Sequence, residues 1–382
     1  MKSWPRNNPA TRERVLLLIL DAIGCAAEGK RLNPHPSFVE QELDGDALIW
    51  FDGRRTDRAQ AALINGTIAH HAELDDGNPR AGLHGGVSVI PAAIAIAEGV
   101  QAEGADLIDA IAFGYAAAVA YGRPLLETIE RHRLHPPAMV GCFGAAAAAA
   151  RLLGLDDETT AGAVTLAGTL MPIAPFESFT RGAPVKDLYG GYPAFVGVRA
   201  AEFAQDGVHG PRAFFESIEL DPNEVDHVYI KPWASCRSTH AALTAFETLL
   251  PLQRSVASIR VETYRFAAEL TADSDPTNAI GAKTSIPHAL AALARQPIAE
   301  RVTVTIGSGE GRYARVTVCY DDGTERSAET SEPRSEADPR GKFRKLAGER
   351  AEAIESAVEG LPRAKDIAAL TAALSSHRIG QR

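Results

Sequence analysis

Apolar residues recur with a helical period through most of the first 220 residues of the chain. The pattern predicts helices over residues 15–27, 59–72, 87–99, 105–121, 144–153, 156–167 and 192–205. Thr11 is placed to cap the first of these helices, and Gly207 to end the last. Pro91 is expected near the first turn of its helix, where proline is tolerated. We therefore expect this part of the chain to be built from packed helices.

The pattern changes near Asp226, where apolar and polar residues begin to alternate. A period of two predicts β-strands over residues 255–264, 301–306, 314–320 and 324–330, with a short strand at 228–230 before them. Residues 321–323, Asp-Asp-Gly, predict the hairpin turn between the last two strands. Helical patterning is expected in residues 240–250 and again from Gly341, after a polar loop at 331–339.

This order predicts a mainly α protein with an inserted α+β domain. The expected boundaries are 1–228 for the first segment of a large helical domain, 229–338 for an α+β lid domain, and 339–382 for carboxyl-terminal helices. The last segment is too short to fold alone, so it should pack back on the first and complete a discontinuous helical domain. A chain of 382 residues is long enough for both cores.

Composition narrows the class of partner. A net charge of −10, from 49 acidic and 39 basic residues, argues against nucleic acid or an anionic membrane as the main partner. The four cysteines are scattered and form no C-x-x-C pair, which predicts reduced thiols in a cytoplasmic protein. The apolar stretch at residues 15–20 is shorter than the ~20 residues of a membrane span, so we expect a buried helix there.

The densest group of reactive side chains is residues 70–76, His-His-Ala-Glu-Leu-Asp-Asp, followed by a Gly/Pro-rich loop to His84. If the helix continues through this run, His71 and Asp75 lie one turn apart on the same face. Such a run can bind a metal ion, or its carboxylates can orient an imidazole. A solvated helix end would give the same local sequence.

Two further clusters stand before predicted helices. His135 precedes two prolines and an alanine-rich helix, where the positive potential of a helix N-terminus favours a neutral imidazole that can act as a general base. Lys186 precedes Tyr189 and the pair Gly190-Gly191, an arrangement suited to binding a carboxylate. A surface histidine and a solvated lysine are the structural alternatives.

A fourth cluster, residues 231–240, combines two cations, a thiol and an imidazole. Cys236 and His240 are four residues apart, which allows a nucleophile–base pair, although the sequence offers no third orienting group. The glycine-rich residues 307–311 lack the following helix and downstream acid of a dinucleotide site, so a hairpin connection is expected there.

These clusters, in this order, resemble the MmgE/PrpD family, which includes 2-methylcitrate dehydratases, cis-aconitate decarboxylases and iminodisuccinate epimerases. The matching stretches are residues 71–76, 84–93, 135–137, 186–191 with the helix at 196–204, 231–240 and, more weakly, 282–288. The resemblance implies a large helical domain, a smaller α+β lid, a homodimer and a site between the domains. It also implies that neither a metal nor an organic cofactor is needed.

The resemblance also implies roles for single residues. His84 and His135 match the family's site histidines, Lys186 its site lysine, and Glu73 or Asp76 would orient an imidazole. The implied substrate-binding residues are Lys231, Arg237, Cys236, Arg80, His288 and Tyr189. Glu73, Gly77 and His288 depart from the residues that are common in the family at these positions.

The implied reaction is proton removal beside a carboxylate of a small di- or tricarboxylate, with cations and N–H donors stabilising the developing charge. Dehydration of the 2-methylcitrate type is the first expectation, and decarboxylation or epimerisation of an acidic substrate remain alternatives. Two other classes are open: a metal-dependent hydrolase built on His70, His71, Glu73 and Asp75, and a non-catalytic carboxylate-binding relative.

Overall fold

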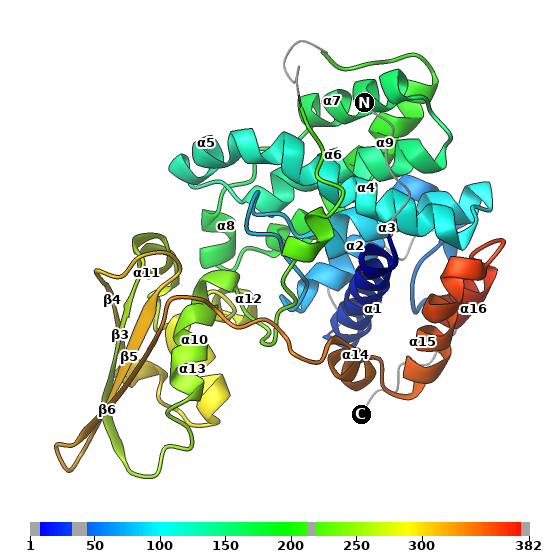
Figure 1. Cartoon of the computed structure of the whole chain (residues 1–382). Helices are drawn as coiled ribbons and strands as arrows, with labels where there is room; N and C mark the ends of the chain where they lie inside the picture. Colours follow the sequence, from blue (N-terminus) through cyan, green and yellow to red (C-terminus); the bar gives the residue numbers. More distant parts are fainter. Residues whose placement is uncertain (1–7, 33–43, 212–217, 376–382) are drawn as a thin grey trace. The chain divides into compact units, whose positions relative to one another are not determined.

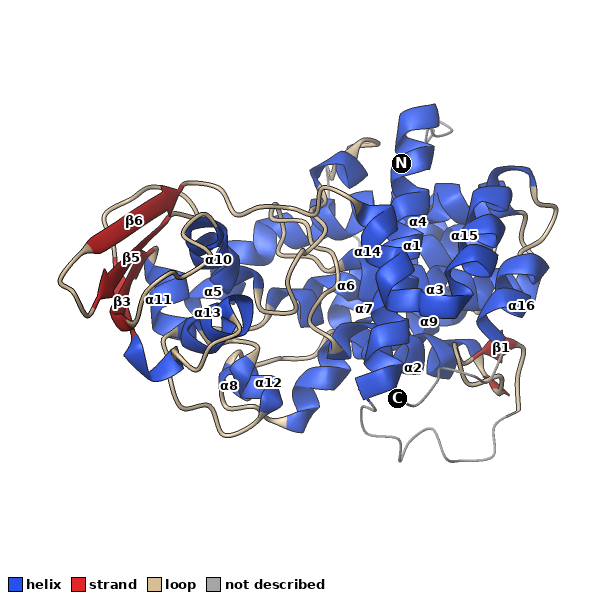
Figure 2. Cartoon of the chain, turned by 90° about the horizontal axis from the view of Figure 1, so that it is seen from below, coloured by secondary structure: helices blue, strands red, loops and turns tan. Residues whose placement is uncertain are grey.

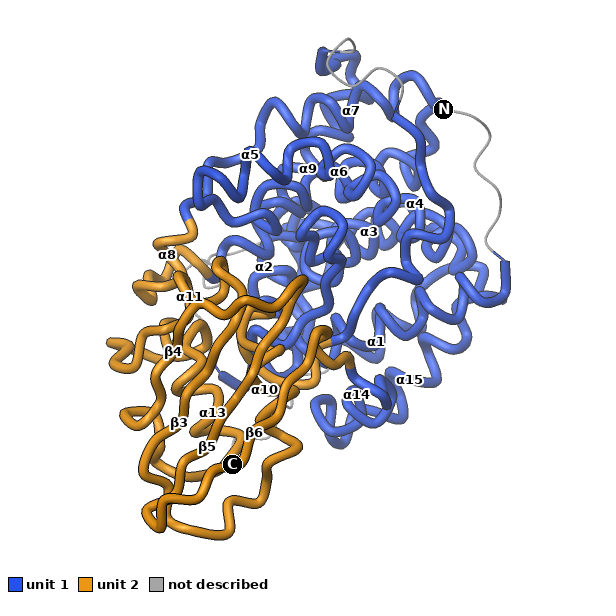
Figure 3. Tube along the Cα trace, turned by 60° about the vertical axis from the view of Figure 1, so that its left-hand side comes forward, with its two compact units in different colours: residues 1–175, 187–230, 336–382 blue, residues 176–186, 231–335 orange. Residues whose placement is uncertain are grey.

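The structure, a computed structural model, describes residues 8–32, 44–211 and 218–375 (Figure 1). The chain forms two compact units. Unit 1 comprises residues 1–175, 187–230 and 336–382, and unit 2 comprises residues 176–186 and 231–335 (Figure 3). Each unit has a hydrophobic cluster of its own, so two cores form from one discontinuous chain.

Unit 1 is built almost entirely from helices (Figure 2). They are α1 (Pro9–Leu32), α2 (Arg58–His71), α3 (Gly85–Val100), α4 (Gly104–Gly122), α5 (Leu126–Arg131), α6 (Pro136–Leu152), α7 (Asp157–Thr169), α9 (Leu188–Gln205), α14 (Pro339–Ala347), α15 (Ala351–Gly360) and α16 (Ala368–Ser375). An antiparallel ribbon, β1 (Ala47–Leu48) and β2 (Arg55–Thr56), accompanies them. Every helix predicted before residue 210 is present; α6 begins eight residues before its predicted start, and the other ends move by up to six residues.

The alanine-rich helix α6 lies at the centre of unit 1. Residues 145–150 are all alanine and completely buried, and α6 packs against α3, α4, α7 and α9. A side chain at Gly144 would collide with the backbone of Gly114 in α4, so the two helices approach as closely as small residues allow. The run Gly104–Arg131 is long and apolar enough to cross a membrane, but 78% of its most apolar window is buried, as in a core helix.

Two local predictions in unit 1 are wrong. Helix α1 begins at Pro9, and the Asn8 side chain accepts the Thr11 N–H at 2.9 Å, so Asn8 rather than Thr11 caps the helix. Residues 228–230 form no strand of a sheet. Instead Tyr229 makes an isolated bridge to Gly77, with N–H···O distances of 3.0 and 2.8 Å, and this bridge ties the segment to the loop after α2.

Unit 2 is an α+β unit. Its strands are β3 (Val256–Thr263), β4 (Val302–Ile306), β5 (Ala314–Tyr320) and β6 (Glu325–Thr330), in the order β4-β3-β5-β6. Its helices are α8 (Glu177–Thr180), α10 (His240–Glu247), α11 (Arg265–Thr271), α12 (Ala279–Ala282) and α13 (Ile286–Ala294). The predicted strands are present and β5–β6 is the predicted hairpin. The glycine-rich loop at 307–311 is not a hairpin connection, because β3 lies between β4 and β5.

Because side chains alternate along the strands, one face of this sheet is apolar and buried and the other is polar and exposed. Ile259, Val261 and Val316 are completely buried in the cluster that contains α10 and α13. Intervening residues carry exposed ion pairs, such as Arg260 with Glu325 at 3.0 Å. Such exposed pairs contribute little stability, so the apolar face is what holds the sheet to its helices.

The chain passes between the two units at 230/231 and 335/336, close to the predicted boundaries at 228/229 and 338/339. Residues 176–186, however, belong to unit 2 rather than to the helical segment. The physical reason is a small apolar cluster in which Phe176 and Phe179 pack with Cys236. Lys186 is therefore a residue of unit 2, whereas His84 and His135 are residues of unit 1.

Candidate active site

The reactive residues after α2 lie on a loop that doubles back on the helix. Helix α2 ends at His71, and Glu73 has a left-handed backbone with φ of 55°, which reverses the chain. The Glu73 N–H donates to the His70 carbonyl at 2.9 Å and secures this reversal. The prediction that His71 and Asp75 share one helix face is therefore wrong, since Asp75 returns to His70 instead.

The Asp75 carboxylate joins two imidazoles. Its Oδ2 lies 2.5 Å from Nδ1 of His84 and 3.3 Å from Nδ1 of His70, and all three side chains are buried. A carboxylate beside Nδ1 keeps the proton on that nitrogen and leaves Nε2 as the atom that exchanges a proton. Asp75 is thus placed to orient an imidazole, the role that the resemblance implies for Glu73 or Asp76.

His135 extends this pair into a row of three imidazoles. It is the N-cap residue of α6, as predicted, and its N–H donates to the Ala174 carbonyl at 2.7 Å. The His70 ring centroid lies 5.9 Å from that of His84 and 6.2 Å from that of His135. The Tyr189 ring lies 5.2 Å from His135, and its hydroxyl donates to the Pro175 carbonyl at 3.1 Å. His84, His135 and Tyr189, predicted from separate clusters, therefore meet in unit 1.

The paired glycines of these clusters are close-packing positions. A side chain at Gly190 in α9 would collide with His70, and one at Gly85 would collide with the ring of Tyr115. Side chains at the other two glycines, Gly86 and Gly191, would meet Asp76 and the Leu63 carbonyl in the same way. Close packing therefore accounts for all four glycines, and a bound carboxylate is not needed to explain them.

Asp76 holds the start of α3. Its Oδ1 accepts the Gly86 N–H at 2.8 Å, and its Oδ2 accepts the Tyr115 hydroxyl at 2.5 Å, while the N-cap residue His84 makes no side-chain cap bond. Burial, reinforced by the charges of Asp21 and Asp75, raises the pKa of Asp76 to about 7. Asp76 therefore positions the helix that carries His84, and it changes charge near neutral pH.

The last residue of α2, His71, forms a second imidazole–carboxylate pair. Nδ1 of His71 lies 3.0 Å from Oδ2 of Asp187, which is the residue after Lys186. The hydrolase hypothesis needed His70, His71, Glu73 and Asp75 together, but His71 is paired with Asp187. Among the described residues, the donor atoms that lie within 4.8 Å of one another belong to His70, Asp75 and His84. Such a donor set suits a transition metal, although the 2.5 Å contact of His84 with Asp75 is also an ordinary proton-bearing pair.

Arg80, a predicted substrate-binding residue, already has its charge balanced. One of its terminal nitrogens, Nη1, lies 2.9 Å from Glu224 and 3.2 Å from Asp221. Glu224 also accepts a hydrogen bond from Asn78 at 2.7 Å, so the arginine belongs to a network that secures the loop before His84. This arrangement favours a structural role for Arg80.

Unit 2 holds the remaining predicted residues. Lys186 is 1% exposed with Nζ 4.4 Å from the ring centroid of Phe179, and Lys231 is completely buried. Arg237 donates to the carbonyls of Arg334 and Pro333 at 2.8 and 3.0 Å. The substrate-binding roles of these cations stay predictions.

His240, the base that its spacing from Cys236 allows, has other polar groups beside its ring. Its two ring nitrogens lie 3.3 Å from Arg237 and 3.2 Å from the Ser235 carbonyl. Cys236 packs with the phenylalanines of the 176–186 segment. His288 is held through Nδ1 by the Ser285 hydroxyl at 3.2 Å, and its substrate role also stays a prediction.

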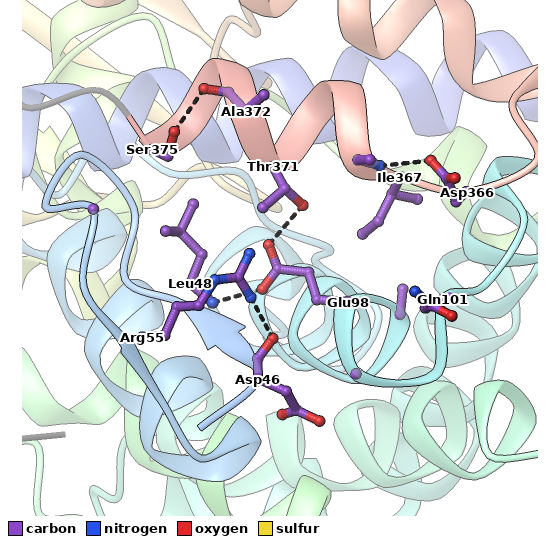
Figure 4. Close-up of a pocket in the computed structure, with 14 residues that line it drawn as sticks. Asp46, Leu48, Arg55, Glu98, Gln101, Asp366, Ile367, Thr371, Ala372 and Ser375 are labelled. Atoms are coloured by element: carbon purple, nitrogen blue, oxygen red, sulfur yellow. Dashed lines mark hydrogen bonds between the residues drawn. The ribbon is translucent and has the colours of Figure 1, made fainter. Parts of the chain in front are cut away.

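A cleft of about 670 Å³ lies elsewhere in unit 1, where β1, β2, α3 and α16 meet (Figure 4). No histidine is among the described residues that line it. Its partly buried Glu98 accepts hydrogen bonds from the Leu48 N–H at 2.6 Å and the Thr371 hydroxyl at 2.8 Å. Glu98 therefore joins three segments of the fold, a contact that no sequence pattern predicts.

Comparison with known proteins adds the family context. The sequence profile of the MmgE/PrpD N-terminal domain matches residues 3–219, a range that contains all the histidines of the imidazole row. The cis-aconitate decarboxylase-like protein oryM of Aspergillus oryzae is 30% identical over 234 residues, which cover 56% of this chain and 46% of that protein. The cis-aconitate decarboxylase of Aspergillus terreus is 27% identical over 214 residues, covering 53% and 43%.

The human cis-aconitate decarboxylase is 34% identical over 162 residues, which cover 39% of this chain and 31% of the human protein. The chain thus matches less than half the length of each of these curated relatives.

Proposed function

Because the chain belongs to the MmgE/PrpD family, we propose that it is a lyase that acts on a small di- or tricarboxylate by proton transfer at carbon. The observation that carries this proposal is the buried Asp75–His84 pair, with 2.5 Å between carboxylate and imidazole. A carboxylate in this position stabilises the imidazolium that forms when the imidazole takes up a proton. The pair therefore suits an acid–base group rather than a structural histidine.

Decarboxylation is the first candidate reaction, since the relatives with the names given above are cis-aconitate decarboxylases. In this reaction the bond to a carboxyl carbon breaks and CO₂ leaves. The electron pair of the broken bond stays on the substrate and delocalises into the conjugated double bond and the neighbouring carboxylate. A proton from Nε2 of His84 or from His135 then completes the product, and solvent later returns that proton to the imidazole.

Dehydration, the first expectation from the sequence, is the second candidate. It needs one group that removes a carbon proton and another that protonates the leaving hydroxyl. The row of His84, His70 and His135 favours it, because it offers more than one imidazole within a short distance. Under either reaction Lys186 and Lys231 are proposed to bind substrate carboxylates, a role that the resemblance implies and that their ammonium groups suit.

The test is turnover of cis-aconitate, 2-methylcitrate and related acids, followed by NMR of the products and by CO₂ release. We expect His84→Asn to lower kcat about 10²–10⁴-fold, the usual contribution of a general acid or base. The matched control is His132→Asn, because His132 is exposed at the end of α5 and should leave turnover unchanged.

CO₂ release from cis-aconitate would support decarboxylation, and water loss from a hydroxy acid would support dehydration. Full turnover by the His84→Asn protein would contradict the proposed mechanism. Loss of turnover on chelation, with stoichiometric bound metal, would instead favour the hydrolase class.

A further inference from the structure

The acidic loop, residues 73–76, accepts a hydrogen bond from a lysine that lies 268 residues further along the chain. Nζ of Lys342 in α14 donates to the Leu74 carbonyl at 2.7 Å and lies 2.6 Å from Oδ1 of Asp21 in α1. The side chains of Lys342 and Asp21 are only 6% and 1% exposed. Helices α1 and α14 pack directly on each other, so the pair is fixed within unit 1 (Figure 1).

The hydrogen bond from Lys342 reaches the middle of the acidic loop. Leu74 follows the reversal at Glu73 and precedes Asp75, which contacts His84, and Asp76, which holds the start of α3. The residues of the loop are therefore held by α2, by the start of α3, by α4 and, through Lys342, by α14. A shift of the Leu74 carbonyl would be passed directly to the Asp75 carboxylate beside it.

The lysine also supplies charge to a crowded acidic region. Lys342 is faced by Asp21 and Cys25 from α1 and by Asp75 from the loop, and these groups raise its pKa although burial lowers it. Asp76 in turn faces Asp21, Asp75, the Tyr115 hydroxyl and the Gly86 N–H. Buried carboxylates this close cannot all stay ionised without a nearby cation.

We propose that Lys342, neutralised by Asp21, is a positioning residue that sets the distance between the Asp75 carboxylate and the His84 imidazole. The inference rests on the proposed function in assigning acid–base work to that imidazole. The position itself is a property of the folded chain and can be measured without turnover. Lys342 touches neither imidazole in the contacts described above, so it acts through the loop.

The experiment observes the His84 ring proton in the full-length protein. An N–H donated to a buried carboxylate across 2.5 Å is deshielded and gives a proton NMR signal downfield of ordinary imidazole N–H signals. Its absence from the His84→Asn protein assigns the signal. We expect Lys342→Met to shift this signal upfield or broaden it away, and Lys342→Arg, which keeps a cation and a donor, to restore it.

Two further variants make the result decisive. Arg344→Met is the matched control, because Arg344 lies on the same helix but pairs with Glu355 at 2.8 Å, and it should leave the signal in place. If Lys342→Met does not fold, the double variant Asp21→Asn with Lys342→Met removes both buried charges and still lacks the hydrogen bond to the Leu74 carbonyl. It should also lose the downfield signal.

A folded Lys342→Met or double-variant protein with the signal at its original position would overturn the proposal. In kinetics on the identified substrate we expect Lys342→Met to lower kcat about tenfold with KM changed less than about twofold, the pattern of a misplaced catalytic group. If the signal responds as expected but the wild-type chain turns over no carboxylate, the positioning inference stands and the proposed function fails.

Discussion

Two regions of unit 1 hold carboxylates that are buried, in the acidic loop, or partly buried, at Glu98, and they differ in what the carboxylates touch. Glu98 accepts hydrogen bonds from a backbone N–H and from the Thr371 hydroxyl, which do not titrate near neutral pH. In the acidic loop, Asp75 faces imidazoles and Asp76 faces a phenol. Burial raises the pKa of both Glu98 and Asp76.

A raised pKa alone therefore does not mark a reactive carboxylate. The nature of the partner separates the two regions, since the partners of Asp75 are imidazoles, which can exchange protons, whereas the partners of Glu98 are a backbone N–H and a hydroxyl. A cleft lies at Glu98, whereas the three imidazoles are buried. Under the proposed function, the partners of the buried acids rather than this cleft mark the reactive region.

The largest expected effect comes from the acidic loop. Asp75→Asn should lower kcat about 10²–10⁴-fold, because an amide can donate to Nδ1 of His84 and favour the wrong tautomer. Steady-state kinetics on the identified substrate measures it. Asp221→Asn, at a partly exposed acid that pairs with Arg80, should stay within about threefold of wild type. Equal losses in both variants would remove the distinction between the two kinds of acid.

The second effect concerns the pH dependence of stability. The pKa of Asp76 is about 7 in the folded chain and near 3.8 when unfolded, so the folded state binds the extra proton between these values. Its contribution to stability is complete below about pH 4 and is lost as the pH rises through about 7.

Chemical unfolding at a series of pH values measures this contribution. Relative to Asp76→Asn, the wild-type chain should lose a few kcal/mol, at most about 4, between pH 4 and pH 8. Parallel stability curves for the two proteins would show that Asp76 does not titrate in this range.

The smallest effect is expected at Glu98, in the cleft of unit 1. Glu98→Gln should cost about 1 kcal/mol of stability or less, because the amide oxygen can still accept the Leu48 N–H while the Thr371 hydroxyl turns to accept from the new N–H₂. Turnover at a temperature where the variant is folded should be unchanged. If Glu98→Gln lost activity as strongly as Asp75→Asn, the cleft in Figure 4 would have to be part of the reaction.

Local pattern determined the elements of this protein. The period of 3.6 placed the helices that now carry His84 and His135, and the period of two placed the strands of unit 2. These predictions succeeded because each depends on which face of one element is buried. The capping prediction at Thr11 failed by a few residues, since the ends of a helix depend on single side chains such as Asn8.

Only the tertiary structure decided which residues meet. Asp75 lies against His84 because one left-handed residue, Glu73, reverses the chain after α2. Lys342 reached the acidic loop through the packing of α14 on α1, and nothing in the local sequence around either segment encodes that contact. Sequence periodicity reports burial along one segment, whereas the site depends on distances between segments that are set only when the whole core packs.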